Sequence, residues 1–415
     1  MQPRRGAGAG RRVAVSGIGA VSGLGWGIAP LWEGLRAGRG GFAPLRRFDP
    51  SLHRTHLAAE AGEPPAEFVR SCPGWHRLSI TDRFALFAAR EAVKGAGLPP
   101  SLGEEAGVYF GSSTGGMFES EVFFSEFLRD RRRARLSALA SQQVNSPGDA
   151  VARHLGAAGP VETLSSACAS GALALGVALE AVRSGEVEVA VAGGSDSLCQ
   201  LTYAGFNALR SVDEEPCRPF RAGRAGMSFG EGAAVLVLEP LERVLARGAT
   251  PLAELVGAGA SCDAHHMTAP DPTGTGAAAA LAAALSDAGL PPTAVDFVNV
   301  HGTGTPLNDA AEWRALQRVF GGRAGEIPLV ATKALVGHLL GCSGAIEAVA
   351  TILCLRHGEL HPAPEGCEAD PDLPVSLVTG EPLPLPEART AVSTSLAFGG
   401  SNAALVFSRW TDGTA

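Results

Sequence analysis

Lysine, tyrosine and methionine are scarce in this sequence. It contains 2 tyrosines and 4 methionines, and charged residues make up only 18% of it. Lys94 and Lys333 are the only lysines among 34 lysine and arginine residues, and the Gly, Ala and Arg bias elsewhere is typical of a high-GC coding background. A lysine retained against that bias is a candidate for a role that the wide, planar head group of arginine cannot fill.

What is missing disfavours several classes of protein. The formal net charge of −8 argues against a nucleic-acid-binding protein. No apolar run approaches the roughly 20 residues that a membrane helix needs. Residues 1–11 contain arginines but no apolar stretch of signal-peptide length, which predicts a short flexible tail. With 46% hydrophobic residues the chain is globular, and we expect a cytoplasmic protein that binds neither nucleic acid nor membrane.

Cysteine is present, but its spacing indicates no shared site. The 8 cysteines are scattered and none forms a C-x-x-C pair. Neither a zinc centre nor a disulfide framework is therefore indicated, and a reducing compartment fits best. We expect no metal, and the open question is whether any single cysteine is chemically special.

Short apolar runs alternate with helix-like stretches along the chain. This alternation predicts an α/β protein whose sheets are covered by helices. The expected strands are 13–16, 107–111, 161–164, 188–192, 234–238, 297–301, 391–395 and 404–407, and the expected helices are 82–95, 117–129, 168–183, 276–288, 309–320 and 343–356. A Gly/Asp/Pro-rich stretch at 257–274 predicts an N-terminal half over 12–256 and a C-terminal half over 257–410, although no clear sequence repeat is visible.

The first glycine-rich motif is similar to a dinucleotide-binding turn but lacks its spacing. Gly17, Gly19 and Gly23 give G-x-G-x-x-x-G after a strand, rather than G-x-G-x-x-G. The acidic residue expected about 20 residues further on is missing, and Arg36-Ala-Gly-Arg39 stands in that region. We therefore interpret the motif as a tight turn after a buried strand.

The segment around Cys168 offers the most chemistry. A strand at 161–164 ends in small residues, Cys168 follows, and a helix pattern then begins. At a helix N-terminus the helix dipole and free N–H groups lower a thiol pKa, and the N–H groups can also hold an oxyanion. The alternative is a packed, inert cysteine, which is the usual fate of an unpaired one. This segment alone does not decide between the two.

Two histidines stand in settings that suit catalysis by a cysteine. His301 ends a strand and opens a Gly/Thr turn, and His338 follows Lys333 in a loop that leads into a helix containing Glu347. A nucleophilic cysteine needs such neighbours to manage charge and protons. A lone histidine is usually a core residue, but two at strand or loop ends favour a function.

Four motifs together resemble the β-ketoacyl-[acyl-carrier-protein] synthases, most closely the synthase I/II type. They are Ser-Ser-Ala-Cys168-Ala-Ser-Gly, His301-Gly-Thr-Gly-Thr-Pro-Leu-Asn-Asp, Thr-Lys333-Ala-Leu-Val-Gly-His338-Leu-Leu-Gly and Leu396-Ala-Phe-Gly-Gly-Ser-Asn402, in the family's order. The resemblance runs over residues 12–410 and implies a thiolase-like, five-layered αβαβα fold of two similar halves. It also implies a homodimer, or a heterodimer with a paralogous ketosynthase-like subunit.

The resemblance further implies a reaction and a role for individual residues. Cys168 would accept an acyl chain from an acyl carrier protein, and malonyl carrier protein would then lose carbon dioxide and extend the chain by two carbons. His301 and His338 would assist the decarboxylation. The backbone N–H groups of Cys168 and Phe398 would form the oxyanion hole, with Phe398 as a gate, and Lys333 would orient the histidine region. The remaining implied residues are Glu347 and Glu312 as acidic supports, Thr303 and Thr305 for the phosphopantetheine arm, and Thr114 and Phe206 in the acyl pocket.

The resemblance implies no tightly bound cofactor, because the phosphopantetheine arm arrives as part of the substrate. An acidic carrier protein would need a locally basic surface on this chain. The run at 129–135, with Arg133 and Arg135, is the best candidate, and Arg210 is a second. For any one arginine, a merely solvated charged face is the alternative.

The sequence departs from the family pattern at three positions. Two aspartates common in the family are replaced by Arg221 and Ala225, so the ion pairs of that loop must differ. Thr114 stands where the type II fatty-acid enzyme has a branched aliphatic residue, which favours a specialised polyketide or polyene synthase. Two alternatives stay open: a non-catalytic, chain-length-factor-like partner subunit, whose relatives lack the cysteine, and a thiolase-like acyl-CoA acyltransferase, whose relatives carry a second cysteine late in the chain.

Overall fold

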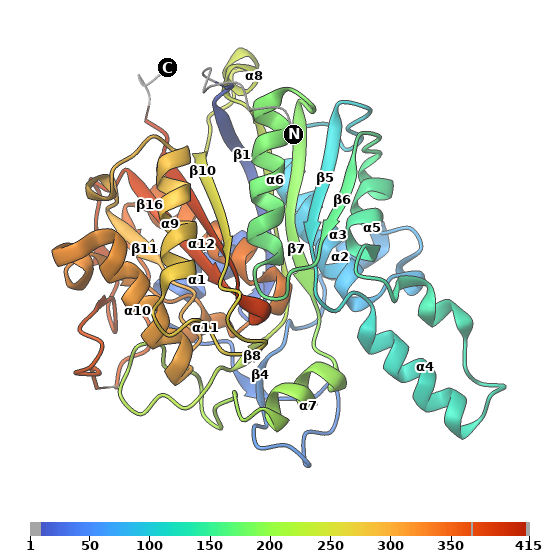
Figure 1. The fold of residues 1–415 in the computed structure, drawn as a ribbon. Helices are drawn as coiled ribbons and strands as arrows, with labels where there is room; N and C mark the ends of the chain where they lie inside the picture. Colours follow the sequence, from blue (N-terminus) through green and yellow to red (C-terminus); the bar gives the residue numbers. More distant parts are fainter. Residues whose placement is uncertain (1–9, 367, 412–415) are drawn as a thin grey trace.

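The computed structural model describes residues 10–366 and 368–411, and it alternates strands and helices along the chain (Figure 1). Every predicted strand and helix overlaps an observed one. The longer strands are β1 Val13–Ser22, β5 Ala106–Gly111, β6 Val161–Leu164, β7 Val189–Asp196, β9 Gly232–Pro240, β10 Ala253–Cys262, β11 Phe297–Asn299, β12 Pro328–Val330, β16 Thr390–Leu396 and β17 Ser401–Arg409. The helices are α1 Ile28–Arg36, α2 Ala66–Ser71, α3 Ile80–Gly95, α4 Met117–Arg129, α5 Ser146–Leu155, α6 Ser170–Ser184, α7 Gln200–Ala208, α8 Leu241–Ala246, α9 Thr275–Asp287, α10 Pro306–Phe320, α11 Lys333–Val336 and α12 Ser343–His357. The short strands are β2 Gly25–Trp26, β3 Ala43–Pro44, β4 Leu57–Ala59, β8 Phe229–Gly230, β13 Glu359–Leu360, β14 Ser376–Leu377 and β15 Leu383–Pro384.

The main sheet repeats the same order outward from its centre. Its strand order is β14-β12-β11-β16-β17-β10-β1-β9-β7-β5-β6. From β1 the neighbours are β9 and β7, both antiparallel, and then β5 and β6, both parallel. From β10 the same pattern runs through β17, β16, β11 and β12. β1 and β10 join the two half-sheets only where Ala14 faces Glu254 and Val15 faces Ala253.

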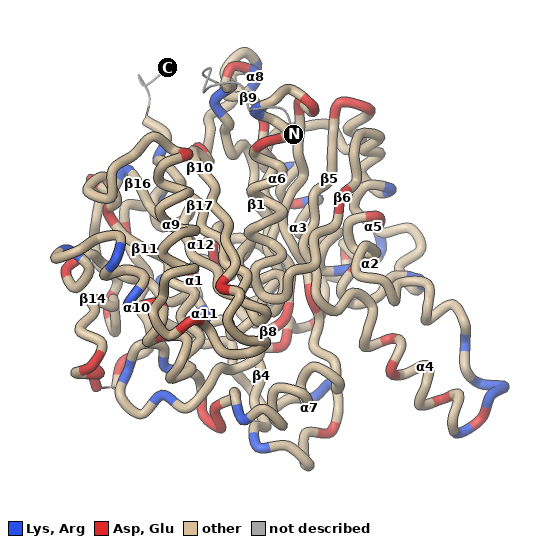
Figure 2. The backbone as a smooth tube through the Cα atoms, in the orientation of Figure 1, with Lys and Arg blue, Asp and Glu red and all other residues tan. Residues whose placement is uncertain are grey.

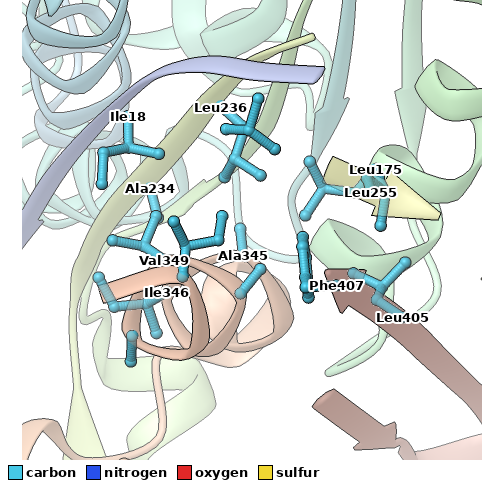
Figure 3. Close-up of a cluster of buried hydrophobic side chains, with 14 of the residues drawn as sticks. Ile18, Leu175, Ala234, Leu236, Leu255, Ala345, Ile346, Val349, Leu405 and Phe407 are labelled. Carbon is cyan, nitrogen blue, oxygen red and sulfur yellow. The ribbon is translucent and has the colours of Figure 1, made fainter. Parts of the chain in front are cut away.

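Helices α6 and α12 form the middle layer between the half-sheets. The central hydrophobic cluster combines both helices with inward-facing residues of β1, β9, β10 and β17. In Figure 3, Val349 of α12 lies beside Ala234 of β9, with Ile18 of β1 above it. Separate clusters pack α3 and α5 on one outer face and α9 and α10 on the other. The predicted five-layered αβαβα fold is confirmed.

Our interpretation of Gly17 and Gly19 as a turn is wrong. Both lie inside β1, which continues to Ser22. A Cβ at Gly17 would come 2.0 Å from the carbonyl oxygen of Ala92 in α3, and one at Gly19 would come 2.0 Å from that of Ala88. These positions need glycine because α3 lies almost against the strand backbone, not because the chain turns or holds a phosphate there.

The same device recurs in β10, a strand that the sequence pattern did not indicate. A Cβ at Gly257 would come 2.4 Å from the carbonyl oxygen of Ala284 in α9, and one at Gly259 would come 2.2 Å from that of Ala280. Gly257 and Gly259, which belong to the stretch expected to separate the two halves, are therefore packing positions inside a strand. The expected boundary between residues 256 and 257 falls within β10, and the division into two halves at that point stays a prediction.

The predicted tail begins outside the described residues. Residues 1–9 are not among them, whereas Arg11 forms an ion pair with Glu188 at 2.7 Å. The end of the predicted tail is therefore attached to the fold. This contact lies on the surface and therefore contributes little to stability.

Helix α6 is apolar for most of its length. The stretch Ala167–Ser184 is the one candidate in the described ranges with the length and composition of a membrane span, and 61% of it is buried inside the fold. Because α6 packs between the two half-sheets, its composition is that of a core helix.

Candidate active site

Eight predicted functional residues, distant in sequence and from both halves of the chain, line one cavity of about 270 Å³. They are Cys168, Phe206, Arg210, His301, Thr303, Thr305, His338 and Phe398. Cys168 is 6% exposed, and His301 and His338 are 1% and 2% exposed. The site therefore holds a sulfur and two imidazoles almost out of contact with bulk water.

Cys168 stands just before α6 on a strained turn. The preceding residue, Ala167, has a φ of 44°, in the left-handed region that non-glycine residues rarely adopt. Its carbonyl oxygen accepts hydrogen bonds from the hydroxyls of Ser113 at 3.0 Å and Ser170 at 2.6 Å. The turn directs the sulfur into the cavity, where the backbone N–H groups of Phe398 and of Cys168 itself interact with it.

The helix N-terminus does not bring the thiol pKa of Cys168 below its usual value. Burial raises the pKa of Cys168 to about 11, while the charge of Lys333 and the N–H groups of Phe398 and Cys168 act in the opposite direction. Loss of water thus outweighs the helix N-terminus in this site. Near neutral pH the resting group is a thiol, and its proton must leave when the sulfur attacks.

His338 is held in one tautomer. The backbone N–H of Leu340 donates to its Nδ1 at 2.9 Å, and the hydroxyl of Ser343 lies 3.1 Å from the same atom. A backbone N–H can only donate, so the ring proton of the neutral imidazole is on Nε2. Leu340 itself has a φ of 52°, in the left-handed region that non-glycine residues rarely adopt.

His301 is held in the same tautomer by Lys333. The Lys333 ammonium lies 3.1 Å from His301 Nδ1, donates to the His301 carbonyl oxygen at 2.7 Å, and also contacts the Glu347 carboxylate. The two histidine rings are perpendicular, with centroids 5.6 Å apart. Burial, followed by the charge of Lys333, holds the pKa of both histidines well below the usual value. The pair therefore offers two neutral imidazoles, each with an Nε2–H donor.

The two predicted acidic supports have different contacts. Glu347 faces Lys333, and burial raises the pKa of Glu347 to about 7 while the lysine charge lowers it. Glu312 accepts the backbone N–H groups of His301 at 2.7 Å and Gly302 at 2.9 Å. It thereby fixes the chain at the end of β11, where the His301 side chain enters the cavity.

The threonine turn and the phenylalanine loop both line the cavity. Thr303 and Thr305 both line it, with their hydroxyl oxygens 2.9 Å apart. The Phe398 ring stacks on Phe206 at a centroid distance of 5.2 Å. Gly399 has a φ of 83°, a conformation that glycine adopts without strain, so the chain can reverse directly after Phe398.

Thr114 does not line this cavity. Its N–H and its hydroxyl both donate to Asp196 at 2.8 Å, and the residue is 5% exposed. Its assignment to an acyl pocket stays a prediction. Asp196, which is 1% exposed, was missed from the sequence; the only available signal was an acidic residue directly after the buried Gly-Gly-Ser end of a strand.

The three candidate docking arginines lie in two places. Arg210 is exposed and lines the mouth of the cavity. Arg133 and Arg135 follow α4, which projects from the body of the molecule with basic residues at its tip (Figure 2). Arg133 is 83% exposed and has Asp130 at 3.6 Å. Only Arg210 is directly beside the site.

The loop that departs from the family pattern has its own ion pairs. Arg224 contacts Asp370 and lies 3.6 Å from Asp309. Ala225 lines the cavity, and its N–H donates to Asp213 at 3.3 Å. Arg221 forms an antiparallel bridge with a neighbouring loop. Arg224 and Ala225 of this loop thus contact acidic residues elsewhere in the chain.

The described residues offer no metal centre. Among them no group of three or more His, Cys, Asp or Glu side chains is placed to hold an ion. The seven described cysteines are all unpaired. The groups that the cavity itself presents include the Cys168 sulfur and the imidazoles of His301 and His338.

The geometry agrees with two family models that together cover most of the chain. The β-ketoacyl synthase N-terminal domain matches residues 10–243, and the β-ketoacyl synthase C-terminal domain matches residues 252–366. The chain belongs to the β-ketoacyl synthase family. Members of this family are acyltransferases, and the four motifs read from the sequence are carried by a thiolase-like fold.

Individual β-ketoacyl synthases match this chain over almost their whole length. The 3-oxoacyl-[acyl-carrier-protein] synthase 2 of Staphylococcus aureus (strain COL) is 36% identical over 410 residues, which cover 96% of this chain and 99% of the relative. A solved structure of the ishigamide ketosynthase/chain length factor superposes with a TM-score of 0.92 at 34% identity, covering 97% of this chain and 100% of the other. A type II PKS acyl-carrier protein in complex with its ketosynthase, bound to the hexaketide, gives a TM-score of 0.89 at 27% identity, with 97% and 100% covered.

Proposed function

We propose that this chain is a condensing β-ketoacyl-[acyl-carrier-protein] synthase of fatty-acid or type II polyketide assembly. The observation that carries the proposal is the shared cavity of Cys168, His301 and His338, with Lys333 directly behind His301. A non-catalytic partner subunit has no need of a sulfur and two oriented imidazoles in one buried cavity. The name of the full-length relative, 3-oxoacyl-[acyl-carrier-protein] synthase 2, supports the same reaction.

The first step is transfer of the acyl chain to Cys168. The sulfur attacks the thioester carbonyl, the bond between the carbonyl carbon and the carrier sulfur breaks, and the thiol proton leaves with the pantetheine sulfur. The N–H groups of Cys168 and Phe398 are placed beside the reacting sulfur. They can stabilise the oxyanion that forms during this attack.

The second step is decarboxylation of malonyl carrier protein. The carbon–carbon bond to the carboxylate breaks, carbon dioxide leaves, and the electron pair forms a thioester enolate. The Nε2–H groups of His301 and His338 are free of the bonds that occupy Nδ1, so they can donate to the enolate oxygen. The enolate carbon then attacks the acyl-cysteine carbonyl, the carbon–sulfur bond breaks, and the Cys168 thiolate regains a proton.

Thr303 and Thr305 suit the phosphopantetheine arm, and Phe398 suits a gate. Both threonines line the cavity with their hydroxyl oxygens 2.9 Å apart, and Thr303 is buried while Thr305 is half-buried. Phe398 lies over the cavity and is only half-buried. A rotation of its ring away from Phe206 would widen the path for malonyl. The phosphopantetheine is carried in by the acyl carrier protein, so the chain needs no cofactor of its own for this reaction.

A second subunit is the expected structural partner. Helix α4 projects from the fold (Figure 1) and exposes Phe124 at 52% and Leu128 at 83%. Exposed apolar side chains of this size favour a protein contact over solvent. The solved ishigamide ketosynthase/chain length factor supports a ketosynthase-like partner, identical to this chain or paralogous. The unpaired cysteines fit a cytoplasmic location.

The test is a reconstituted condensation. The protein is incubated with acyl and malonyl carrier proteins, alone and with a paralogous partner subunit, and the release of carbon dioxide and the 3-oxoacyl product are followed. We expect one turnover product that is two carbons longer than the acyl group, and covalent labelling of Cys168 by a cerulenin-type inhibitor. Absence of both product and label, with and without the partner, contradicts the proposal.

Cys168→Gln separates the two steps. This variant should reduce condensation by more than about 10³-fold, because no group remains to hold the acyl chain, while malonyl decarboxylation continues. Condensation at the wild-type rate would show that Cys168 is not the nucleophile. An acyl-chain panel analysed by mass spectrometry then identifies the preferred chain length and saturation, and thereby the pathway.

A further inference from the structure

We propose that Asp196, at the end of β7, is the positioning residue that aligns the cysteine turn with the loop that holds His338. Asp196 does not line the cavity, and the mechanism above does not use it. The proposal rests on the proposed function, because its consequence is the relative placement of the groups for the two half-reactions. It is carried by a hydrogen-bond network that joins three segments distant in sequence.

Asp196 accepts hydrogen bonds from five donors. Its Oδ1 accepts the Ser112 hydroxyl at 2.8 Å, the Ser113 N–H at 3.0 Å, and both the N–H and the hydroxyl of Thr114 at 2.8 Å. Its Oδ2 accepts the Ser113 N–H at 3.0 Å and the Gly341 N–H at 2.6 Å. Backbone N–H groups cannot accept a proton, so three of these five donors require the carboxylate to be an acceptor.

One branch of this network reaches the nucleophile. Asp196 fixes the backbone of Ser113, and the Ser113 hydroxyl donates to the Ala167 carbonyl oxygen at 3.0 Å. Ala167 carries the strained φ of 44° that precedes Cys168. The position of the sulfur therefore depends on a turn that Asp196 holds through one intervening side chain.

The other branch reaches His338. Gly341, whose N–H is bound by Asp196, follows Leu340, whose N–H donates to His338 Nδ1 at 2.9 Å. The fit at Gly341 is tight, because a Cβ there would come 2.7 Å from both Asp196 Oδ2 and the Ser113 hydroxyl oxygen. Only glycine allows the carboxylate to approach this segment, and a shift of the segment would turn the His338 ring.

The negative charge of Asp196 gives a way to distinguish a positioning role from a merely structural one. Burial raises the pKa of Asp196, and bonds from Thr114 and Ser112 lower it in part. The negative charge of Asp196 itself raises the pKa of Cys168. Loss of the charge would therefore increase thiolate at a given pH and, by charge alone, speed alkylation of Cys168. A slower acyl transfer in the same variant must then come from misplacement of the sulfur.

The experiment compares Asp196→Asn with the wild-type enzyme. The amide keeps the size of the side chain but places an NH₂ against N–H donors. We expect kcat to fall about 10- to 100-fold in both acyl transfer and malonyl decarboxylation, with KM for each carrier protein within about two-fold of wild type. Alkylation of Cys168 by iodoacetamide at pH 8 should be as fast as in the wild type or faster.

Two further variants separate the branches and provide a matched control. Ser113→Ala removes only the bond to Ala167, so it should slow acyl transfer and leave decarboxylation within about two-fold. Glu239→Gln neutralises another fully buried carboxylate, which binds Arg243 and Arg247. It should lower the unfolding temperature without changing either half-reaction. If Asp196→Asn does not fold, the rates of acyl transfer and malonyl decarboxylation are measured in Ser112→Ala and Ser113→Ala instead.

The outcomes are separable from those of the proposed function. If the wild-type protein performs neither half-reaction, the proposed function fails. If the wild type is active and folded Asp196→Asn keeps both rates within about two-fold, the positioning role is overturned. The positioning role is also overturned if Asp196→Asn only raises KM. The same holds if Asp196→Asn and Glu239→Gln, compared at matched stability, lose the same activity.

Discussion

The two halves of the molecule are built alike, but they differ in the residues that precede their central helices. Helices α6 and α12 each have 15 residues and each end at a glycine in the left-handed region. They cross closely and reciprocally: a Cβ at Gly171 would come 3.1 Å from the Cβ of Ala345, and one at Gly344 would come 2.7 Å from that of Ala172. Counting back from the helix starts, Gly341 holds the position before α12 that Cys168 holds before α6.

This difference explains why a duplicated fold has one reactive centre. In the N-terminal half the position before the helix carries a thiol with two backbone N–H groups beside it. In the C-terminal half the equivalent N–H of Gly341 is occupied by the Asp196 carboxylate at 2.6 Å. The C-terminal half instead contributes the imidazoles and Lys333. Each half thus supplies what the other lacks, and the chemistry can be divided between them by mutation.

The largest expected effect comes from removing the contribution of the C-terminal half. His338→Ala should slow malonyl decarboxylation by about 10²- to 10⁴-fold, because it deletes one of two enolate donors. Acylation of Cys168 should stay within about ten-fold, since its oxyanion donors are backbone groups of other residues. Single-turnover acylation and carbon dioxide release measure the two steps. An equal loss in both would show that the halves do not divide the chemistry in this way.

Lys333→Arg tests the lysine that the composition singled out. The ammonium lies among His301 Nδ1, the His301 carbonyl oxygen and Glu347 with 1% of its surface exposed. A planar guanidinium does not fit this compact arrangement, so kcat should fall about 10- to 100-fold. Lys94→Arg, in the exposed part of α3, is the matched control and should leave kcat unchanged. Near-normal activity of Lys333→Arg would remove any special role for the retained lysine.

The pH dependence of decarboxylation tests the charge that Lys333 brings to the histidines. Burial and Lys333 lower the pKa of His301 and His338 below 6.5. The active form is the neutral pair, so activity persists below pH 6.5 and is lost only as pH falls through the lowered pKa values. Lys333→Met removes a charge that lowers both pKa values, so the acid limb should move to higher pH. An unchanged limb, or one at lower pH, contradicts this account.

The close packing of helix on strand gives a stability comparison between the halves. Gly17→Ala would place a Cβ 2.0 Å from a helix carbonyl oxygen, and Gly257→Ala would place one 2.4 Å from another. Each should lower the free energy of unfolding by about 1–3 kcal/mol or more, because the helix must move outward. Denaturant unfolding, with the exposed Gly205→Ala as control, measures the effect. A negligible change in the free energy of unfolding of either variant would show that the helix facing that glycine packs less closely on the strand than the structure indicates.

The sequence predicted part of the secondary structure and several cavity residues, and the failures have a common physical cause. Periodicity and motif order identified eight of the strands, six of the helices and the cavity-lining Cys168, His301 and His338. The glycines of β1 and β10 were misread because a glycine that admits a neighbouring helix looks the same in sequence as a glycine that turns the chain. The sequence left the state of the Cys168 thiol open because the burial that raises its pKa depends on tertiary packing. Asp196 was missed because its donors come from segments that only the fold brings together.

The smallest expected effects concern docking of the carrier protein, and they separate the cavity mouth from the projecting α4. Arg210 lines the mouth, so Arg210→Ala should raise KM for acyl carrier protein about two- to five-fold with kcat unchanged, and more salt should reduce the difference. Arg133 and Arg135 follow α4 in the chain, and α4 exposes apolar residues. Arg133→Ala and Arg135→Ala therefore test this projecting segment. If that segment docks the carrier, these variants change KM as Arg210→Ala does. If it packs against a second subunit, sedimentation will show a weaker dimer while KM stays constant, and the docking surface is then confined to the mouth.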